Sequence, residues 1–348
     1  MLLIRKRAYA RAGLVGNPSD GYHGKTISII VRNLHAEVVL YEWDRVEIMW
    51  SDEDQSRFRS VDELVRDVKL HGYYGGIRLV KATIKKFVEY CRRERQSLHS
   101  RNFSVRYQST IPRQVGLAGS SAIIVATLRC LIEFYGISIP RHVQPSLARA
   151  VETEELGIAA GLQDRVIQVY EGVVYMDFAR KQMRSESGYL YGIYEPLDPR
   201  LLPPLYIAYK DTVSEPTEVF HNDIRERYAR GDESVVTAMN KFADLAARAR
   251  AALTAGDHLA LSRLMDENFD TRRSIYNLPQ GQIEMIERAR SLGASAKFAG
   301  SGGAIIGTYK DETQFAQLEI ALRRLGCVVL KPLVCPQESG VGEFERSC

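Results

Sequence analysis

Cysteine and histidine are scarce in this 348-residue sequence, and neither is arranged as a metal site. The five cysteines are odd in number and far apart, and they include no Cys-x-x-Cys pair. The seven histidines stand singly, without a His-Glu-x-x-His motif or a Cys/His cluster at zinc spacing. A disulfide framework and a tightly bound transition metal are therefore disfavoured, and any metal ion is expected to arrive with a substrate.

Long hydrophobic runs are also missing. The most apolar stretch, residues 122–139, is interrupted by Arg129 and Glu133, and the basic residues near the N-terminus are not followed by the apolar run of a signal peptide. The chain is 45% hydrophobic and 26% charged, as is typical of soluble globular proteins. We therefore expect a cytoplasmic protein without a membrane partner, and its length predicts two domains.

Positive charge is only mildly in excess, since the formal net charge is +4. Nine basic residues gather between Arg78 and Arg106, a density that would suit a nucleic-acid surface. This run lacks interleaved exposed aromatic residues and any recognisable nucleic-acid module, so the solvated face of a helix is the better interpretation. No nucleic-acid partner is expected.

Hydrophobic periodicity outlines strands first, then helices, then a second mixed region. A proline-rich stretch at 197–204 predicts the boundary between two domains, 1–198 and 199–336, followed by a loose tail at 337–348. In the first domain the patterns predict strands at 8–14, 26–31, 36–41, 46–50, 103–107 and 173–178 and helices at 61–71, 76–96, 120–135, 145–156 and 161–170. In the second they predict strands at 205–209, 295–298, 304–309 and 327–330 and helices within 218–290 and at 312–325.

Residues 112–122, Pro-Arg-Gln-Val-Gly-Leu-Ala-Gly-Ser-Ser-Ala, lie between a predicted strand and a predicted helix. Gly116 and Gly119 let the backbone turn sharply and approach a ligand, and the two serines that follow open a helix whose first amides have no internal partner. These amides and the helix dipole favour a phosphate, and a serine hydroxyl suits a phosphate-bound Mg²⁺. An ordinary helix cap is the alternative interpretation. The sequence contains neither a Walker loop nor a Gly-x-Gly-x-x-Gly motif after a strand.

Three further segments carry polar or glycine-rich patterns. Residues 297–304, Lys-Phe-Ala-Gly-Ser-Gly-Gly-Ala, lie between two predicted strands and suit either close backbone approach or a hairpin turn. Residues 11–20 form a strand that ends in a polar turn with an arginine and an acid nearby. Residues 152–165 hold an acidic helix and a Gly-Leu-Gln-Asp turn that places Asp164 at the start of the next helix. Asp164 is either a functional carboxylate or an ordinary first-turn residue that the helix dipole favours.

Taken together and in this order, the four segments resemble motifs of the galactokinase, homoserine kinase, mevalonate kinase and phosphomevalonate kinase (GHMP) superfamily. Residues 112–122 are similar to its Pro-x-x-x-Gly-Leu-x-Ser-Ser-Ala phosphate loop, with one extra residue before the serines. Residues 11–20 and 297–304 resemble its N-terminal and C-terminal motifs. The resemblance implies an α+β two-domain GHMP kinase fold, with an N-terminal α/β domain like ribosomal protein S5 and a ferredoxin-like α+β domain at the C-terminus.

Within this superfamily the chain resembles the plant glucuronokinases over nearly its whole length. The stretches that carry this resemblance are 16–20, 71–78, 111–122, 161–165 and 298–304. The resemblance implies an ATP-dependent sugar 1-kinase that converts D-glucuronate to D-glucuronate 1-phosphate. Heptose-phosphate kinases of the same superfamily share the Glu-x-Glu and Gly-x-Gln-Asp patterns and are the alternative, and a non-catalytic ligand sensor on the same fold is a second one.

The same resemblance implies a role for each motif residue. Asp164 would take the proton of the anomeric hydroxyl or orient that hydroxyl, Arg11 would keep the carboxylate ionised, and Asp20 would bind sugar hydroxyls. Mg²⁺ would be held by Ser121 and Glu152, although Glu154 and Glu155 lie close enough on one helix to replace the latter. ATP would contact Pro112, Val115, Gly116, Leu117, Ala118, Gly119, Ser120, Ser121 and Ala122. The substrate would contact Gly300, Ser301, Gly302 and Gly303.

A sugar acid also needs a cation for its carboxylate, and a guanidinium suits that best because it binds in bidentate fashion. Arg113 and Arg165 are the candidates because both lie inside motif segments, and ion pairs to neighbouring acids such as Glu152 are the alternative. Tyr74 would cover the sugar or the adenine, or pack in the core. The expected ligands are thus ATP, Mg²⁺ and a small sugar or sugar acid, and the oligomeric state stays open.

Overall fold

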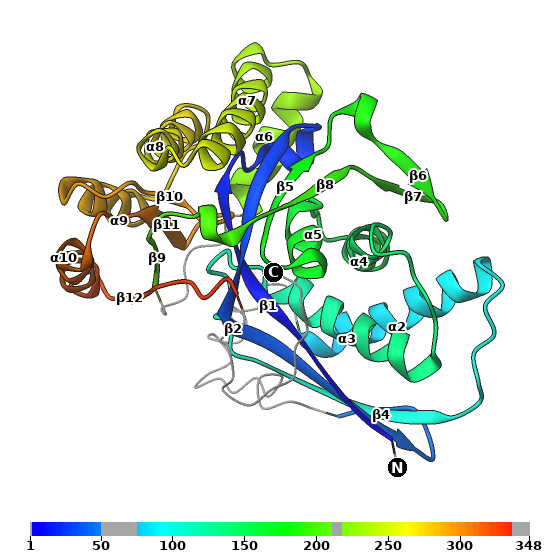
Figure 1. The fold of residues 1–348 in the computed structure, drawn as a ribbon. Helices are drawn as coiled ribbons and strands as arrows, with labels where there is room; N and C mark the ends of the chain where they lie inside the picture. Colours follow the sequence, from blue (N-terminus) through cyan, green and yellow to red (C-terminus); the bar gives the residue numbers. More distant parts are fainter. Residues whose placement is uncertain (1, 50–74, 211–217, 336–348) are drawn as a thin grey trace, which may run out of the picture.

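The computed structural model describes residues 2–49, 75–210 and 218–335, and these residues form two main β-sheets with helices packed around them (Figure 1). The predicted helix at 61–71, Tyr74 and the predicted tail at 337–348 lie outside the described residues. Within the described part, no helix combines the length and the apolarity that crossing a membrane requires.

The first sheet is built on two long antiparallel strands, β1 (Leu3–Val15) and β2 (Lys25–Trp43). Its strand order is β3-β4-β2-β5-β8, with β1 paired to β2. β4 pairs with the C-terminal part of β2 and β5 with its N-terminal end, so β2 joins the whole sheet. The remaining strands are β3 (Glu47–Ile48), β4 (Asn102–Ser109), β5 (Val173–Asp177) and β8 (Ile193–Leu197).

The sequence predicts two strands, 26–31 and 36–41, where the structure has the single strand β2. The polar stretch Arg-Asn-Leu-His at 32–35 separates two apolar runs and therefore looks like a turn. In the structure the register between β1 and β2 shifts at Tyr9 and Ala10, opposite this stretch, and the strand continues through the irregularity. The predicted break was wrong because a bulge accommodates polar residues without ending the strand.

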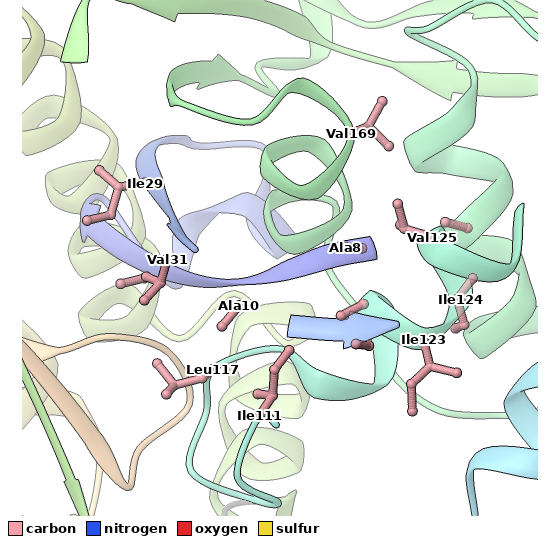
Figure 2. Close-up of a cluster of buried hydrophobic side chains, with 14 of the residues drawn as sticks. Ala8, Ala10, Ile29, Val31, Ile111, Leu117, Ile123, Ile124, Val125 and Val169 are labelled. Atoms are coloured by element: carbon pink, nitrogen blue, oxygen red, sulfur yellow. The ribbon is translucent and has the colours of Figure 1, made fainter. Parts of the chain in front are cut away.

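Helix α3 (Gly119–Tyr135) is the central helix of the first half. It is apolar on nearly every side because it packs against β1 and β2 on one side and against α2 (Gly76–Arg93) on the other. Figure 2 shows Ile123, Ile124 and Val125 of α3 in one buried cluster with small residues of β1. Ile111 and Leu117, which lie in the loop before α3, belong to the same cluster, so the core anchors that loop.

The helix predicted at 145–156 is divided in the structure. Helix α4 (Gln144–Ala150) runs into a π-helical turn, η3 (Val151–Glu155), and α5 (Gln163–Tyr170) follows after a short connection. The π turn inserts one residue into the helical repeat and so changes which acidic side chains share a face. The strands β6 (Arg184–Glu186), β7 (Tyr189–Tyr191) and β8 are not predicted from the sequence, because they are only three to five residues long and β8 contains a proline.

The second sheet is fully antiparallel, in the order β10-β11-β9-β12. A chain order of strand, helices, two strands, helix and strand in this arrangement is the ferredoxin-like topology, which confirms the predicted fold of the C-terminal half. The strands are β9 (Leu205–Lys210), β10 (Lys297–Phe298), β11 (Ala304–Thr308) and β12 (Cys327–Leu330). The helices are α6 (Glu218–Ala229), α7 (Glu233–Ala255), α8 (His258–Ile275), α9 (Gln280–Ser291) and α10 (Glu312–Arg323).

Helices α7 and α8 connect the two sheets. α7 packs against β2 of the first sheet, and α8 packs against β1 and against β10 of the second (Figure 1). Phe242 and Leu245 of α7 lie in the same buried cluster as Ile27 of β2. The two halves therefore share a core where their polar loops meet. The change of sheet falls between β8 and β9, and the limits 1–198 and 199–336 stay a prediction.

Candidate active site

The loop between β4 and α3 has the backbone of an anion site. Gln114, Gly116 and Ala118 all have left-handed backbones, with φ angles of 60°, 71° and 65°. α3 begins at Gly119 without a side-chain cap, so its first amides are left for a ligand. Left-handed residues alternating with others aim successive N–H groups into one concavity, and the helix dipole adds a partial positive charge there. This arrangement suits phosphate oxygens.

The loop is held by burial and by β1. Val115 and Leu117 are almost fully buried and fix the loop on the core. The backbone amide of Arg11 donates to the carbonyl of Leu117 at 3.2 Å, and the Arg11 guanidinium donates to the carbonyl of Gly116 at 2.5 Å. The amides between these carbonyls are thereby presented in a fixed orientation, at little cost in ordering when an anion binds.

The glycine cluster at 299–303 lies directly against this loop. A Cβ on Gly116 would lie 2.5 Å from the carbonyl oxygen of Gly302, and a Cβ on Gly300 would lie 2.1 Å from the carbonyl oxygen of Gly116. Only glycine permits so close an approach of two backbones. The two glycine motifs, nearly 200 residues apart in sequence, therefore form one continuous backbone surface.

Asp164 stands in the first turn of α5 and faces Arg11 of β1. Arg11 Nε donates to its Oδ1 at 2.6 Å, and Arg165 Nη1 donates to its Oδ2 at 3.4 Å. Burial by itself would raise the pKa of Asp164, but the charges of Arg11 and Arg165 outweigh it and leave that pKa below its ordinary value. The side chain keeps 21% of its surface exposed, so an ionised carboxylate is within reach of a substrate.

Glu152 is 2% exposed and lies on the π turn η3. Its Oε2 accepts two bonds from Arg165, through Nη2 and, at 2.9 Å, through Nε. Its Oε1 accepts from the hydroxyl of Ser120 at 3.1 Å, whereas the Ser121 hydroxyl turns back to the carbonyl of Ala118 at 3.2 Å. The structure therefore brings Glu152 to Ser120 rather than to Ser121.

The two neighbouring acids point elsewhere. Glu154 pairs with Lys86 at 2.8 Å and Glu155 pairs with Lys85 at 2.5 Å, both on α2. Among the three acids of the turn, Glu152 is thus the one that faces the loop. In the part of the chain that the structure describes, no group of three or more His, Cys, Asp or Glu side chains converges on one point.

Asp20, in the turn η1 (Ser19–Tyr22), lies beside Asp164. Its Oδ2 accepts from the backbone amide of Gln163 at 3.3 Å and would lie 1.9 Å from a Cβ on Gly161. Burial, and then repulsion from Asp164, raises the pKa of Asp20 to about 6. The two carboxylates therefore border one space and differ in proton affinity.

The two arginines predicted to bind a sugar carboxylate differ in their surroundings. The Arg165 guanidinium donates to Glu152, to Asp164 and to the carbonyl of Gly161. Arg165 thus forms the ion pair with a neighbouring acid that the sequence left open as the alternative. Arg113 is exposed on the phosphate side of the site. The glycine loop, with Gly300, Ser301, Gly302 and Gly303, lies against the phosphate loop, and Tyr74 falls outside the described residues.

Sequence reasoning missed the residues that brace the glycine cluster. Arg272 of α8 donates to the carbonyls of Gly300 and Ser301, both at 2.8 Å. The fully buried Lys297 amine donates to the carbonyl of Gly13, to Asn17 Oδ1 and to the carbonyl of its neighbour Phe298 at 2.6–2.7 Å. Burial, and then repulsion from Arg272 and Arg11, lowers the pKa of Lys297 well below its ordinary value.

A sequence signal for this bracing did exist on α8. Asn268 and Arg272 are four residues apart on its apolar face, where they are buried among leucines and aromatic residues. Asn268 accepts from the amide of Gly16 at 2.6 Å and donates to the carbonyl of Asn17 at 3.1 Å. Polar side chains on a buried stripe indicate specific partners, because burying them unpaired is costly.

Fold and site together define a small-molecule kinase whose phosphate loop is neither a Walker loop nor a dinucleotide motif. Residues 78–172 match the family model for the GHMP kinases N terminal domain, and residues 249–326 match that for the GHMP kinases C terminal domain. "Glucuronokinase 1" of Arabidopsis thaliana is 44% identical over 309 residues, which cover 87% of this chain and 84% of that protein. "Probable glucuronokinase 2" of the same plant is 44% identical over 335 residues, which cover 94% and 90%.

A solved structure supports the fold. The galactokinase of Lactococcus lactis, complexed with galactose, matches with a TM-score of 0.73 at 14% identity, over 95% of this chain and 93% of that one. This chain belongs to the GHMP kinase family. It is accordingly a phosphotransferase with an alcohol group as acceptor and ATP as the phosphate donor of its family.

Proposed function

We propose that this chain transfers the γ-phosphoryl group of ATP to the anomeric hydroxyl of D-glucuronate, giving D-glucuronate 1-phosphate and ADP. The single observation that carries the proposal is the pairing of ionised Asp164 with Arg11 beside the phosphate loop. The 44% identity to two proteins named as glucuronokinases, over most of both chains, supports the choice of acceptor. Asp164 and Asp20 supply a reacting end and a hydroxyl-binding end for one sugar ring.

In this reaction the anomeric oxygen forms a bond to the γ-phosphorus, and the bond from that phosphorus to the β,γ-bridging oxygen breaks. ADP leaves with the electron pair, and the hydroxyl proton passes to Asp164. The lowered pKa makes Asp164 a weak base that is always ionised at neutral pH. Its main contribution is therefore to hold the hydroxyl in line, because phosphoryl transfer depends chiefly on positioning and charge neutralisation. Arg11 bridges Asp164 and Gly116, and so couples the two substrates.

The phosphate loop would hold the β- and γ-phosphates through its backbone amides. Mg²⁺ keeps most of its water when bound and takes one or two protein oxygens besides phosphate oxygens. Glu152 Oε1 and the hydroxyls at the start of α3 are donors of this kind, so the residues present fit a Mg²⁺ ion that arrives with the nucleotide. When bound, the ion would neutralise charge that develops on the phosphates. Ser120, rather than Ser121, is the serine that already meets Glu152.

The proposal is tested by ADP release from ATP and Mg²⁺ with a panel of acceptors. The panel contains D-glucuronate, D-galacturonate, D-glucose, D-galactose, a heptose 7-phosphate and mevalonate. We expect the largest kcat/KM with D-glucuronate. Preference for a heptose phosphate or for mevalonate would refute the acceptor while leaving the fold untouched, and ADP release that no acceptor stimulates would favour a ligand sensor.

A further inference from the structure

The arginines next to the reacting carboxylate are already engaged. The guanidinium of Arg165 is shared among Glu152, Asp164 and the carbonyl of Gly161. The guanidinium of Arg11 binds Asp164 and the carbonyl of Gly116. That of Arg272 binds the carbonyls of Gly300 and Ser301. None of these three can turn towards a sugar carboxylate without breaking buried bonds, so the acid group of the substrate must be met by other cations.

Arg149 is the first such cation. It lies at the C-terminal end of α4, where it is exposed and donates through Nε to the carbonyl of Ala160 at 2.9 Å. Ala160 precedes Gly161, against which the Asp20 carboxylate packs. Arg149 therefore lies at one end of the turn 160–163, and Asp164 lies at the other end. A ring that meets Asp164 with its reacting hydroxyl and Asp20 with its other hydroxyls extends towards Arg149.

Arg225 is the second cation. It lies on the exposed face of α6. Burial raises the pKa of Tyr22, two residues after Asp20, and the nearby charge of Arg225 opposes that rise. Tyr228, one helical turn further on, packs edge-on against the Tyr22 ring with centroids 4.7 Å apart. The packing of Tyr228 on Tyr22 therefore places the turn of α6 that carries Arg225 beside η1, from the opposite half of the molecule.

The charges of the two arginines act on each other. Arg149 is exposed at the surface but partly shielded from water by the protein around it, and this shielding, followed by the charges of Arg165 and Arg225, lowers the pKa of Arg149, while Asp20 acts in the other direction. Arg165 is neutralised by Glu152 and Arg11 by Asp164, whereas Arg149 and Arg225 form no ion pair with the carboxylates that the structure describes. This end of the site therefore carries a surplus of positive charge, which suits an anionic group on the acceptor.

We propose that Arg149 and Arg225 form the carboxylate subsite of this kinase and select sugar acids over neutral sugars. This assignment rests on the proposed function and replaces Arg113 and Arg165 as the residues that read the acid group. The guanidiniums approach the C6 carboxylate from α4 and from α6, so the acid is recognised only when both halves of the chain are in place. Charged bidentate contacts of this kind favour a planar carboxylate over a hydroxymethyl group.

The test compares KM and kcat for D-glucuronate and for D-glucose in the full chain. In Arg149→Gln and Arg225→Gln we expect KM for D-glucuronate to rise about ten- to one-hundredfold, as for loss of a hydrogen bond to a charged group. We expect kcat, KM for ATP and kcat/KM for D-glucose to stay within about threefold. Arg149→Lys and Arg225→Lys keep the charge and are expected to recover part of the affinity. Arg230→Gln, an exposed arginine just after α6, is the matched control.

Calorimetric binding of D-glucuronate, D-glucose and D-glucose 6-phosphate separates this proposal from the proposed function. Poor turnover of D-glucuronate by the unaltered chain would defeat the proposed function. With that turnover intact, unchanged D-glucuronate affinity in both Gln variants would overturn the subsite, and so would equal losses for D-glucuronate and D-glucose. Tighter binding of D-glucose 6-phosphate than of D-glucuronate by the unaltered chain would assign the two arginines to a phosphate instead.

Discussion

The two ends of the site are built by different means. The phosphate end consists of backbone: left-handed residues at 114, 116 and 118, the first amides of α3, and a glycine loop pressed against them. The proposed sugar end consists of side chains that come from β1, η1, α4, α5 and α6. Every ATP carries the same phosphates. A backbone site that binds them can therefore stay unchanged when the acceptor differs. The acceptor end sets the substrate and changes by side-chain replacement.

The largest expected effect is at the junction of the two ends. Asp164→Asn removes the charge that orients the hydroxyl and receives its proton, and we expect kcat to fall by about 10²–10⁴-fold. The KM for ATP should change much less, because the backbone end is untouched. ADP release and the thermal unfolding midpoint are measured together.

Asp198→Asn is the matched control for Asp164→Asn, because Asp198 pairs with Arg200 on the surface. We expect it to leave kcat unchanged. An Asp164→Asn variant that keeps full kcat would show that Asp164 has no part in the transfer.

The backbone end should respond to one added methyl group. In Gly300→Ala the new Cβ would lie 2.1 Å from the carbonyl oxygen of Gly116 and 2.6 Å from Arg11 Nη1, so the two glycine loops must separate. We expect a loss of about 1–3 kcal/mol in the free energy of unfolding and a KM for ATP raised roughly tenfold or more. Denaturant unfolding and nucleotide titration measure these quantities.

Gly281→Ala is the control for Gly300→Ala, because Gly281 lies in α9 with its nearest side-chain atom, Lys210 Nζ, 3.7 Å from the added Cβ. Alanine is the better helix former, so we expect a gain of about 0.5–1 kcal/mol there. Equal nucleotide affinity in Gly300→Ala and Gly281→Ala would mean that contact between the two glycine loops is not needed for the phosphate site.

A third expected effect is a pH dependence at the sugar end. The pKa of Asp20 is about 6 in the folded chain, above its ordinary value, so the folded state takes up a proton more readily than the unfolded state. The associated stability is fully present below about pH 4 and is lost as the pH rises through about 6. Asp20→Asn should therefore raise the unfolding free energy at pH 8 by roughly 1–3 kcal/mol, with no gain below pH 4.

Activity should move in the opposite direction at Asp20. We expect kcat/KM for the sugar to fall in the unaltered chain as the pH drops through about 6, because protonated Asp20 accepts fewer hydrogen bonds from hydroxyls. In Asp20→Asn the value should be lower at pH 8 and should lack this step. If the step at pH 6 persists in the variant, another group titrates there.

The difference between the phosphate end and the sugar end also explains how much of the site could be predicted from the sequence. The phosphate loop, the glycine cluster and Asp164 lie in short local patterns, and the structure brings them together. The apolar stripe of α8 indicates that Asn268 and Arg272 have specific partners, but local patterns could not show that these residues and Lys297 brace the loops, because the partners are distant in the chain. The prediction of two strands in place of β2 is wrong for a similar reason, since only the pairing of β2 with β1 carries the strand through a polar stretch.

The carboxylate candidates illustrate the limit most clearly. Arg113 and Arg165 are the candidates from the sequence because they lie inside motifs, and in the structure Arg165 is fully engaged by Glu152 and its neighbours. Arg149 and Arg225 lie outside every motif and meet near Asp20 only through folding. Residues of the kind proposed here to select the acceptor are thus the hardest to find from one sequence.

The most direct measurement is the structure of the product made from D-glucuronate, ATP and Mg²⁺, read by proton and phosphorus NMR. Asp164 next to the phosphate loop predicts a single new phosphate ester whose phosphorus couples to the anomeric proton, formed in equal amount with ADP. A phosphate ester at any other carbon, or ADP without an ester, would contradict the placement of the anomeric hydroxyl between the two ends of the site.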